Sequence, residues 1–239
     1  MKREGNRPVT IEPNTLAEIS LFRGLPQERL RRLAEVLRKK TVPAGTNMIT
    51  AEQPGEVVYI LLEGTVKILI EQVDGREVIL AFLGAGDTVG EMSLVDSSGR
   101  CANVVTTEPT RLFWMDRVTF QACLQRMSPL SYNLVRLLSN RLRFANEQIL
   151  ALCTLDVPGR LARQILALAD RYGNEGQAGE VTIPLRLTQS DLGEIVGASR
   201  ERVNQVMMEF KQRGFVSVDG NHRIQVHDRA GLAQLCRPE

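Results

Sequence analysis

The sequence predicts an α+β protein: an N-terminal antiparallel β-roll, one long helix and a C-terminal winged helix-turn-helix. Three patterns indicate this order. Short β-rich runs punctuated by glycines occupy Thr41 to Asp116, and a heptad of apolar residues follows Ser128-Pro129. Two capped helical segments and a hairpin signal come after Leu187.

Length and composition indicate an ordinary globular protein. The chain has 239 residues, of which 43% are hydrophobic and 24% charged. Its longest apolar runs, Val57 to Leu62 and Val78 to Leu83, are six residues each and too short to cross a membrane. Because Met1 to Pro8 lacks the apolar core of a secretory signal, we expect a cytoplasmic protein that does not bind membranes.

The cysteines and histidines argue against a metal site. The cysteines lie 22, 30 and 83 positions apart, at Cys101, Cys123, Cys153 and Cys236. No Cys-x-x-Cys pair occurs, and His222 and His227 both come near the C-terminus. This spacing does not match zinc or iron–sulfur ligation, so we expect reduced thiols and no metal. The net charge is only +2, so any contact with DNA depends on a local surface.

The segment from Leu16 to Lys40 has apolar residues at helical spacing, and we expect two short helices there. Six basic residues would lie on the outer side of the second: Arg29, Arg31, Arg32, Arg38, Lys39 and Lys40. We interpret them as a solvated helix face rather than a nucleic-acid surface.

Between Thr41 and Asp116 the pattern is that of a small antiparallel β-roll. Glycines recur every 9 to 11 residues, at Gly45, Gly55, Gly64, Gly75 and Gly84. They separate β-rich runs at Val57 to Leu62, Val66 to Ile70, Val78 to Leu83 and Arg111 to Met115. Asp74-Gly75 is a hairpin signal between two of these runs.

The long helix carries a heptad seam with spacings of 3 and 4, formed by Val135, Leu138, Leu142, Ala145, Ile149 and Leu152. An apolar seam of this length must be buried. Leu134 and Leu137 can face the β-roll, which leaves the seam for a second copy, and a parallel two-fold dimer through residues 128–155 is the simplest solution. The alternative is a helix that packs only within one chain.

Asp156-Val157-Pro158-Gly159 predicts a hinge into a second domain. The expected division is therefore 1–127 for the β-roll with its flanking helices, 128–155 for the dimerisation helix and 156–239 for the DNA-binding domain. Within the last, Leu161, Ile165 and Leu168 predict another amphipathic helix.

A helix-turn-helix is predicted from about Thr188 to Arg213. Thr188-Gln189-Ser190-Asp191 is typical of a capping box, Gly197 permits the turn, and Ser199 can cap the second helix. The buried face of that helix would hold Val203, Val206, Met207 and Phe210. Its outer side would present Arg200, Glu201, Arg202, Asn204, Gln205 and Gln212.

This outer face has the chemistry for reading DNA. An arginine can donate two hydrogen bonds to guanine, a glutamine can pair with adenine, and a glutamate can accept from cytosine. Downstream, Phe215 to Val218 and Ile224 to Val226 flank Asp219-Gly220-Asn221 and predict a hairpin wing, which places His222 and His227 on its surface. A plain αα-hairpin is the alternative, but it does not account for the caps, the polar face and the wing together.

From Leu21 to Val226 the chain resembles the cyclic AMP receptor protein and fumarate-nitrate regulator family of bacterial transcription factors. The match is carried by Gly197-Ala198-Ser199-Arg200-Glu201 as the start of the recognition helix and by Asp156 to Arg160 as the hinge. Gly90-Glu91-Met92-Ser93-Leu94 and Arg100-Cys101-Ala102 resemble the family's phosphate-binding cassette. The resemblance implies a β-roll of the cyclic-nucleotide-binding type, a double-stranded β-helix.

The resemblance also implies an effector site formed by Gly90, Glu91, Met92, Ser93, Arg100, Cys101, Arg141, Ala145 and Asn146. The glycines of Gly86 to Glu91 let backbone amides approach an anion, Arg100 offers a guanidinium to the phosphate, and Glu91 can accept from a ribose hydroxyl. The DNA-binding residues implied are Thr188, Gln189, Ser199, Arg200, Glu201, Arg202, Asn204 and Gln205. Cyclic AMP is the leading effector.

Three departures and two absences refine this expectation. Cys101 replaces the family's serine or threonine and is a weaker donor to phosphate, and Ala145-Asn146 replaces its base-contacting pair. Gln205 replaces a second guanine-reading arginine, which predicts a changed half-site. The lack of cysteines before Cys101 excludes the iron–sulfur branch, and the lack of sensor-domain histidines argues against haem.

The expected function is a homodimeric regulator in which a small nucleotide reorients two recognition helices on a two-fold operator of double-stranded DNA. RNA polymerase is the expected partner in activation, through the loop from Gly173 to Gly179. One alternative is the same dimer acting without a ligand or with another effector. The other alternative is a metal-dependent β-barrel enzyme, but the chain lacks the histidine ligands that such an enzyme would need.

Overall fold

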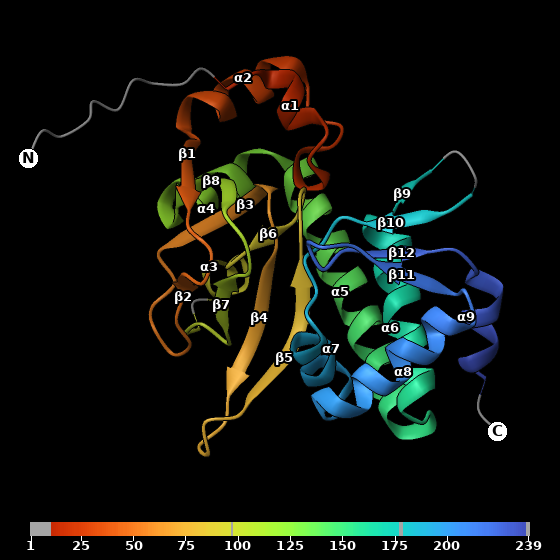
Figure 1. Ribbon diagram of the computed structural model, residues 1–239. Helices are drawn as coiled ribbons and strands as arrows, with labels where there is room; N and C mark the ends of the chain where they lie inside the picture. Colours follow the sequence, from red (N-terminus) through yellow and green to blue (C-terminus); the bar gives the residue numbers. More distant parts are fainter. Residues whose placement is uncertain (1–10, 97, 177–178, 238–239) are drawn as a thin grey trace, which may run out of the picture.

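The computed structural model describes residues 11–96, 98–176 and 179–237. Its elements confirm the predicted fold: a β-roll, a long helix and a winged helix-turn-helix follow one another along the chain (Figure 1). The segment Met1 to Pro8 and positions 177 and 178 of the expected polymerase-contact loop lie outside the described residues. No helix among the described residues is both long and apolar enough to span a membrane.

The β-roll consists of two four-stranded antiparallel sheets. In one sheet the order is β1 (Arg38–Val42), β8 (Thr110–Asp116), β3 (Val57–Glu63) and β6 (Thr88–Val89). In the other it is β2 (Asn47–Ile49), β7 (Asn103–Thr106), β4 (Val66–Glu71) and β5 (Glu77–Leu83). Between them lies a core that includes Leu61, Val66, Val104 and Leu112, all at most 3% exposed.

The predicted hairpin at Asp74-Gly75 joins β4 to β5, which pair in antiparallel register. Gly75 has a φ of 80°, a left-handed conformation that glycine adopts without strain. The Asp74 carboxylate accepts a hydrogen bond from the Arg76 amide at 3.1 Å. Local turn chemistry therefore fixes the connection that the sequence predicted.

Short helices cover one end of the roll: α1 (Pro13–Ala17), a 3-10 turn (Ser20–Phe22), α2 (Gln27–Val36), α3 (Met92–Val95) and α4 (Arg117–Arg126). The expectation that the basic helix extends to Lys40 is wrong, because α2 ends at Val36 and Arg38, Lys39 and Lys40 lie in β1. β1 is the edge strand of its sheet, and exposed charges on an edge oppose pairing with another chain.

The long helix α5 (Ser128–Thr154) has one buried and one exposed apolar side. Leu130 and Leu134 pack into the core formed with the N-terminal helices and the roll. Val135, Leu142 and Ile149 are 60%, 63% and 59% exposed. Leu138, expected on the seam, packs partly against the core, and Leu137 lines a cleft bounded by the roll loop Ala85 to Asp87 and by the next helix.

The C-terminal part begins two residues after α5. Asp156 caps α6 (Val157–Tyr172) by accepting from the Gly159 amide at 2.9 Å. The other helices are α7 (Gln189–Val196), α8 (Arg200–Gln212) and α9 (Arg229–Leu235). A sheet of order β11-β12-β10-β9 comprises β11 (Val216–Val218), β12 (Ile224–Val226), β10 (Val181–Ile183) and β9 (Asn174–Glu175). β11 and β12 form the predicted wing.

The C-terminal part is docked on the β-roll of its own chain. Figure 1 shows α7 beside the β4–β5 hairpin. Leu69, Ile79 and Phe82 of this hairpin share one buried cluster with Leu192 and Ile195 of α7. The buried apolar core of the C-terminal part is therefore continuous with the β4–β5 hairpin of the roll.

Candidate functional site

Arg100 is buried at the centre of the cassette. Its guanidinium donates to the Gly90 carbonyl at 2.6 Å, the Ser93 hydroxyl at 2.9 Å and the Val57 carbonyl at 2.7 Å. Burial lowers the pKa of Arg100, but an arginine remains charged at any physiological pH. Gly90 has a φ of 84°, and a β-carbon there would lie 2.5 Å from Arg100 Nη1, so only glycine fits beside this side chain.

Glu91 and Arg141 form a buried ion pair next to Arg100. The Arg141 Nη1 to Glu91 Oε1 distance is 2.6 Å, and the Glu91 side chain is 2% exposed. Arg141 also donates to the Thr88 carbonyl at 2.5 Å. Three buried polar atoms here lack a hydrogen-bond partner: Glu91 Oε2, Arg141 Nε and Thr88 Oγ1. Buried polar groups normally have partners, so this grouping is typical of a site for a polar ligand.

Glu91, Arg100 and Arg141 line a hollow of about 90 Å³ that also includes apolar residues such as Ile49 and Leu83. Seven of the predicted effector residues line it: Gly90, Glu91, Met92, Ser93, Arg100, Cys101 and Arg141. Ala145 and Asn146 are exposed on α5 and do not line the hollow within one chain. Thr88 was not among the predicted residues, although its place between Gly86 and Gly90 could have indicated it.

The helix-turn-helix has the predicted caps. The Thr188 hydroxyl accepts from the Asp191 amide at 3.2 Å, and the Asp191 carboxylate accepts from the Thr188 amide at 3.2 Å. Gly197 ends α7 with a φ of 64°, and Ser199 accepts from the Arg202 amide at 3.2 Å to begin α8. These bonds satisfy amides that the first turn of each helix leaves free.

The recognition helix α8 has the predicted division into two faces. Val203, Val206, Met207 and Phe210 are each at most 2% exposed and pack into the C-terminal core. The opposite face exposes Arg200, Glu201, Arg202, Asn204 and Gln205. Gln189 at the start of α7 donates to Asn204 at 3.0 Å, which links the predicted DNA-binding residues of both helices.

Known protein families match both parts of the chain. A cyclic nucleotide-binding domain model matches residues 39–127, and a Crp-like helix-turn-helix domain model matches residues 159–235. The CRP-like cAMP-activated global transcriptional regulator of Mycobacterium tuberculosis is 33% identical, over 93% of this chain and 98% of that protein. The chain belongs to the CRP/FNR family of transcription regulators. The cyclic AMP receptor protein of Thermus thermophilus is 29% identical, over 90% of this chain and 95% of its own length.

Solved structures of the family show the same fold. FixK2 from Bradyrhizobium japonicum superposes with a TM-score of 0.75 at 20% identity, covering 85% of this chain and 99% of that one. The c-di-GMP responsive regulator CLP of Xanthomonas campestris has a TM-score of 0.66 at 25% identity, covering 85% and 100%. The protein is thus a DNA-binding transcription regulator with a cyclic-nucleotide-binding domain.

Proposed function

We propose that this protein is a homodimeric regulator whose binding to a two-fold operator is switched by cyclic AMP. The observation that carries the proposal is Glu91, which is almost fully buried beside two arginines and has one unpartnered carboxylate oxygen. A ribose hydroxyl would satisfy that oxygen, and a cyclic phosphate would draw on the guanidinium of Arg100. The cyclic AMP relatives named above support the choice of effector.

Binding requires the hollow to open. Its volume of about 90 Å³ is below the roughly 300 Å³ at which ligand pockets begin. Arg100 must therefore exchange its bonds to the Gly90 and Val57 carbonyls for bonds to the phosphate. Cys101 lies next to it and is exposed, so its thiol faces the solvent side of the hollow.

The exposed seam of α5 supports the dimer. Val135, Leu142 and Ile149 recur every seven residues, and each is more than half exposed. A twin helix would cover them by coiled-coil packing. Ala145 and Asn146 lie on or beside this seam, so a nucleotide that reached Asn146 would connect the effector site directly with the dimer.

At the DNA we assign base contacts to Arg200, Glu201 and Gln205, because they occupy the exposed N-terminal half of α8. Because Gln205 replaces a second guanine-reading arginine, we expect the DNA half-site to have a different base at that contact. Contact with RNA polymerase through residues 173–179 is part of the proposal for activation.

The test is calorimetric titration of the full-length protein with cyclic AMP, cyclic GMP and cyclic di-GMP. We expect cyclic AMP to bind, and the Arg100→Leu variant to lose binding by at least about tenfold, because a charge-assisted contact to the phosphate is removed. The cyclic di-GMP arm addresses the alternative suggested by the Xanthomonas relative.

The matched control is Arg111→Leu, which removes an exposed arginine whose ion pair with Glu63 lies outside the hollow. This variant should bind cyclic AMP as the unmodified protein does. Absence of any heat of binding with cyclic AMP in the unmodified protein would refute the choice of effector.

A further inference from the structure

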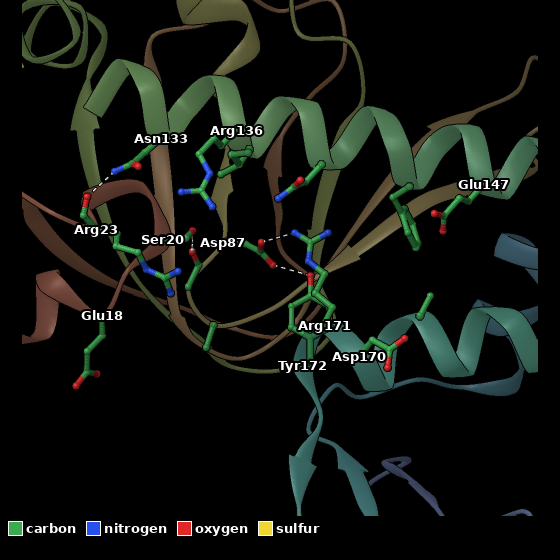
Figure 2. A pocket seen from close by; sticks show the side chains of 16 residues that line it. Glu18, Ser20, Arg23, Asp87, Asn133, Arg136, Glu147, Asp170, Arg171 and Tyr172 are labelled. Carbon is green, nitrogen blue, oxygen red and sulfur yellow. Dashed lines mark hydrogen bonds and ion pairs between the residues drawn. The ribbon is translucent and has the colours of Figure 1, made fainter. Parts of the chain in front are cut away.

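Asp87 connects the cassette loop to the DNA-binding domain. It lies one residue before β6, is 7% exposed, and its carboxylate accepts three hydrogen bonds. Two come from the C-terminal end of α6: Tyr172 Oη lies 2.7 Å from Oδ2, and Arg171 Nη2 lies 2.5 Å from Oδ1. The third comes from the Gly84 amide at 3.0 Å. Figure 2 shows Arg171 and Tyr172 meeting Asp87 at the edge of a cleft beneath α5.

The contact is closely packed and electrostatically favourable. A β-carbon on Gly84 would lie 2.6 Å from Leu185 and 3.6 Å from the Tyr172 ring, so the two domains touch here through a glycine. Burial and the carboxylate of Asp87 raise the pKa of Tyr172, which keeps its hydroxyl protonated as a donor. Burial lowers the pKa of Arg171, but Asp87 and Tyr172 together outweigh that effect and the pKa is raised.

Asp87 is also joined to the effector hollow through the main chain and one arginine. Its neighbour Thr88 offers its carbonyl to Arg141, and the same guanidinium pairs with Glu91. A nucleotide hydroxyl that donates to the unpartnered Oε2 of Glu91 enters directly beside the guanidinium of Arg141, which pairs with Oε1 of the same carboxylate and must shift to make room. Movement of Arg141 changes its bond to Thr88, one residue from the carboxylate that holds α6.

The docked arrangement coincides with a constricted hollow. While Asp87 bonds to Arg171 and Tyr172, the hollow between Arg100, Glu91 and Arg141 has a volume of only about 90 Å³. A ligand that needs a larger hollow binds another arrangement better, and its binding shifts the population toward that arrangement. If the ligand also raises affinity for DNA, the docked arrangement is the one with low DNA affinity.

We infer that Asp87, Arg171 and Tyr172 are positioning residues that couple the effector site to the recognition helix of the same chain. In the absence of nucleotide their contact holds α6 against the cassette, and effector binding weakens it and frees the DNA-binding domain to turn. This inference rests on the proposed function. It predicts that loosening the contact mimics the effector.

The test uses full-length Asp87→Asn protein and a DNA duplex selected from a random library by the unmodified protein with cyclic AMP. Removal of the charge should raise DNA affinity without cyclic AMP by about tenfold, the effect of one charge-assisted hydrogen bond, and leave affinity at saturating cyclic AMP unchanged. By linkage, the free Asp87→Asn protein should also bind cyclic AMP more tightly. Tyr172→Phe should act in the same direction, and it does not alter the loop.

The control is Asp170→Asn, which makes the same change one residue before Arg171. Asp170 pairs with Arg229 of α9 and not with the cassette. The Asp170→Asn variant should have the same ratio of DNA affinities with and without cyclic AMP as the unmodified protein. If Asp87 had a merely structural role, Asp87→Asn would lower the DNA affinities with and without cyclic AMP together, and that result would overturn the inference. An unchanged ratio of these two affinities in Asp87→Asn and Tyr172→Phe would also overturn it. A lack of cyclic AMP response in the unmodified protein would instead refute the proposed function, and the inference with it.

Discussion

At the scale of single residues, the effector pocket is set by a few buried charges and by one unusual thiol. Arg100 and Glu91 occupy the positions that their motif implied, and both are almost fully buried. Cys101 is exposed beside Arg100, and a thiol is a weak hydrogen-bond donor. If Cys101 contacts the phosphate as proposed, the strength of binding should depend on whether position 101 carries sulfur or oxygen.

The Cys101→Ser variant should bind cyclic AMP more tightly. A hydroxyl donates a stronger hydrogen bond to a phosphate oxygen, and a net gain of about 1 kcal/mol corresponds to about fivefold in the dissociation constant. Calorimetry of the two proteins measures this difference directly.

Cys153→Ser serves as the matched control, because Cys153 is also an exposed free thiol but lies near the end of α5, outside the hollow. Its affinity for cyclic AMP should equal that of the unmodified protein. Weaker or equal binding by Cys101→Ser would show that residue 101 does not donate to the ligand.

At the scale of elements, α5 has two functions that its sequence separates onto two sides. Leu130 and Leu134 pack it against its own roll, and the seam, which we propose a second copy covers, is exposed. The heptad was visible in the sequence because helical periodicity is local. The partial burial of Leu138 was not, because it depends on where the N-terminal helices pack.

The Leu142→Glu variant should be a monomer in solution. Burying a leucine contributes about 1.5 to 3 kcal/mol for each chain, and a charge at the same place in the seam of both helices adds repulsion. Sedimentation equilibrium should give the unmodified protein a mass twice that of the 26.7 kDa chain and give the variant the mass of one chain.

Val118→Glu is the control for adding a charge at an exposed apolar position, since Val118 is 76% exposed on α4 and outside the seam. It should remain dimeric. A dimeric Leu142→Glu protein would contradict the assignment of the seam.

Other elements show how far local patterns predict structure. The caps at Thr188 and Ser199 and the turn at Gly197 were predicted because each depends on residues within a few positions. The strand β1 was not, because Arg38-Lys39-Lys40 has no alternation of apolar and polar residues and pairs with β8, more than 70 positions later. The contact of Asp87 with Arg171 joins residues 84 positions apart and has no local signal at all.

At the scale of the whole molecule, one buried apolar core joins the β-roll that holds the effector hollow to the domain that holds the recognition helix. The core of the C-terminal domain extends into the β4–β5 hairpin. In addition, Lys67 Nζ of β4 lies 3.6 Å from Asp191 Oδ1 of α7, within ion-pair distance. A ligand that opens the hollow therefore acts on a domain already in contact with the roll. In a dimer the orientation of each such domain decides whether two recognition helices meet successive major grooves, about 34 Å apart.

In the proposed function, cyclic AMP controls the affinity of this dimer for a two-fold operator. The most direct measurement is a titration of the selected duplex with the unmodified full-length protein, with and without saturating cyclic AMP. Salt must be held constant, because phosphate contacts alone change affinity with ionic strength. We expect cyclic AMP to raise the affinity by about 5- to 150-fold, the usual range of coupling between two sites. Equal affinities with and without cyclic AMP would contradict the claim.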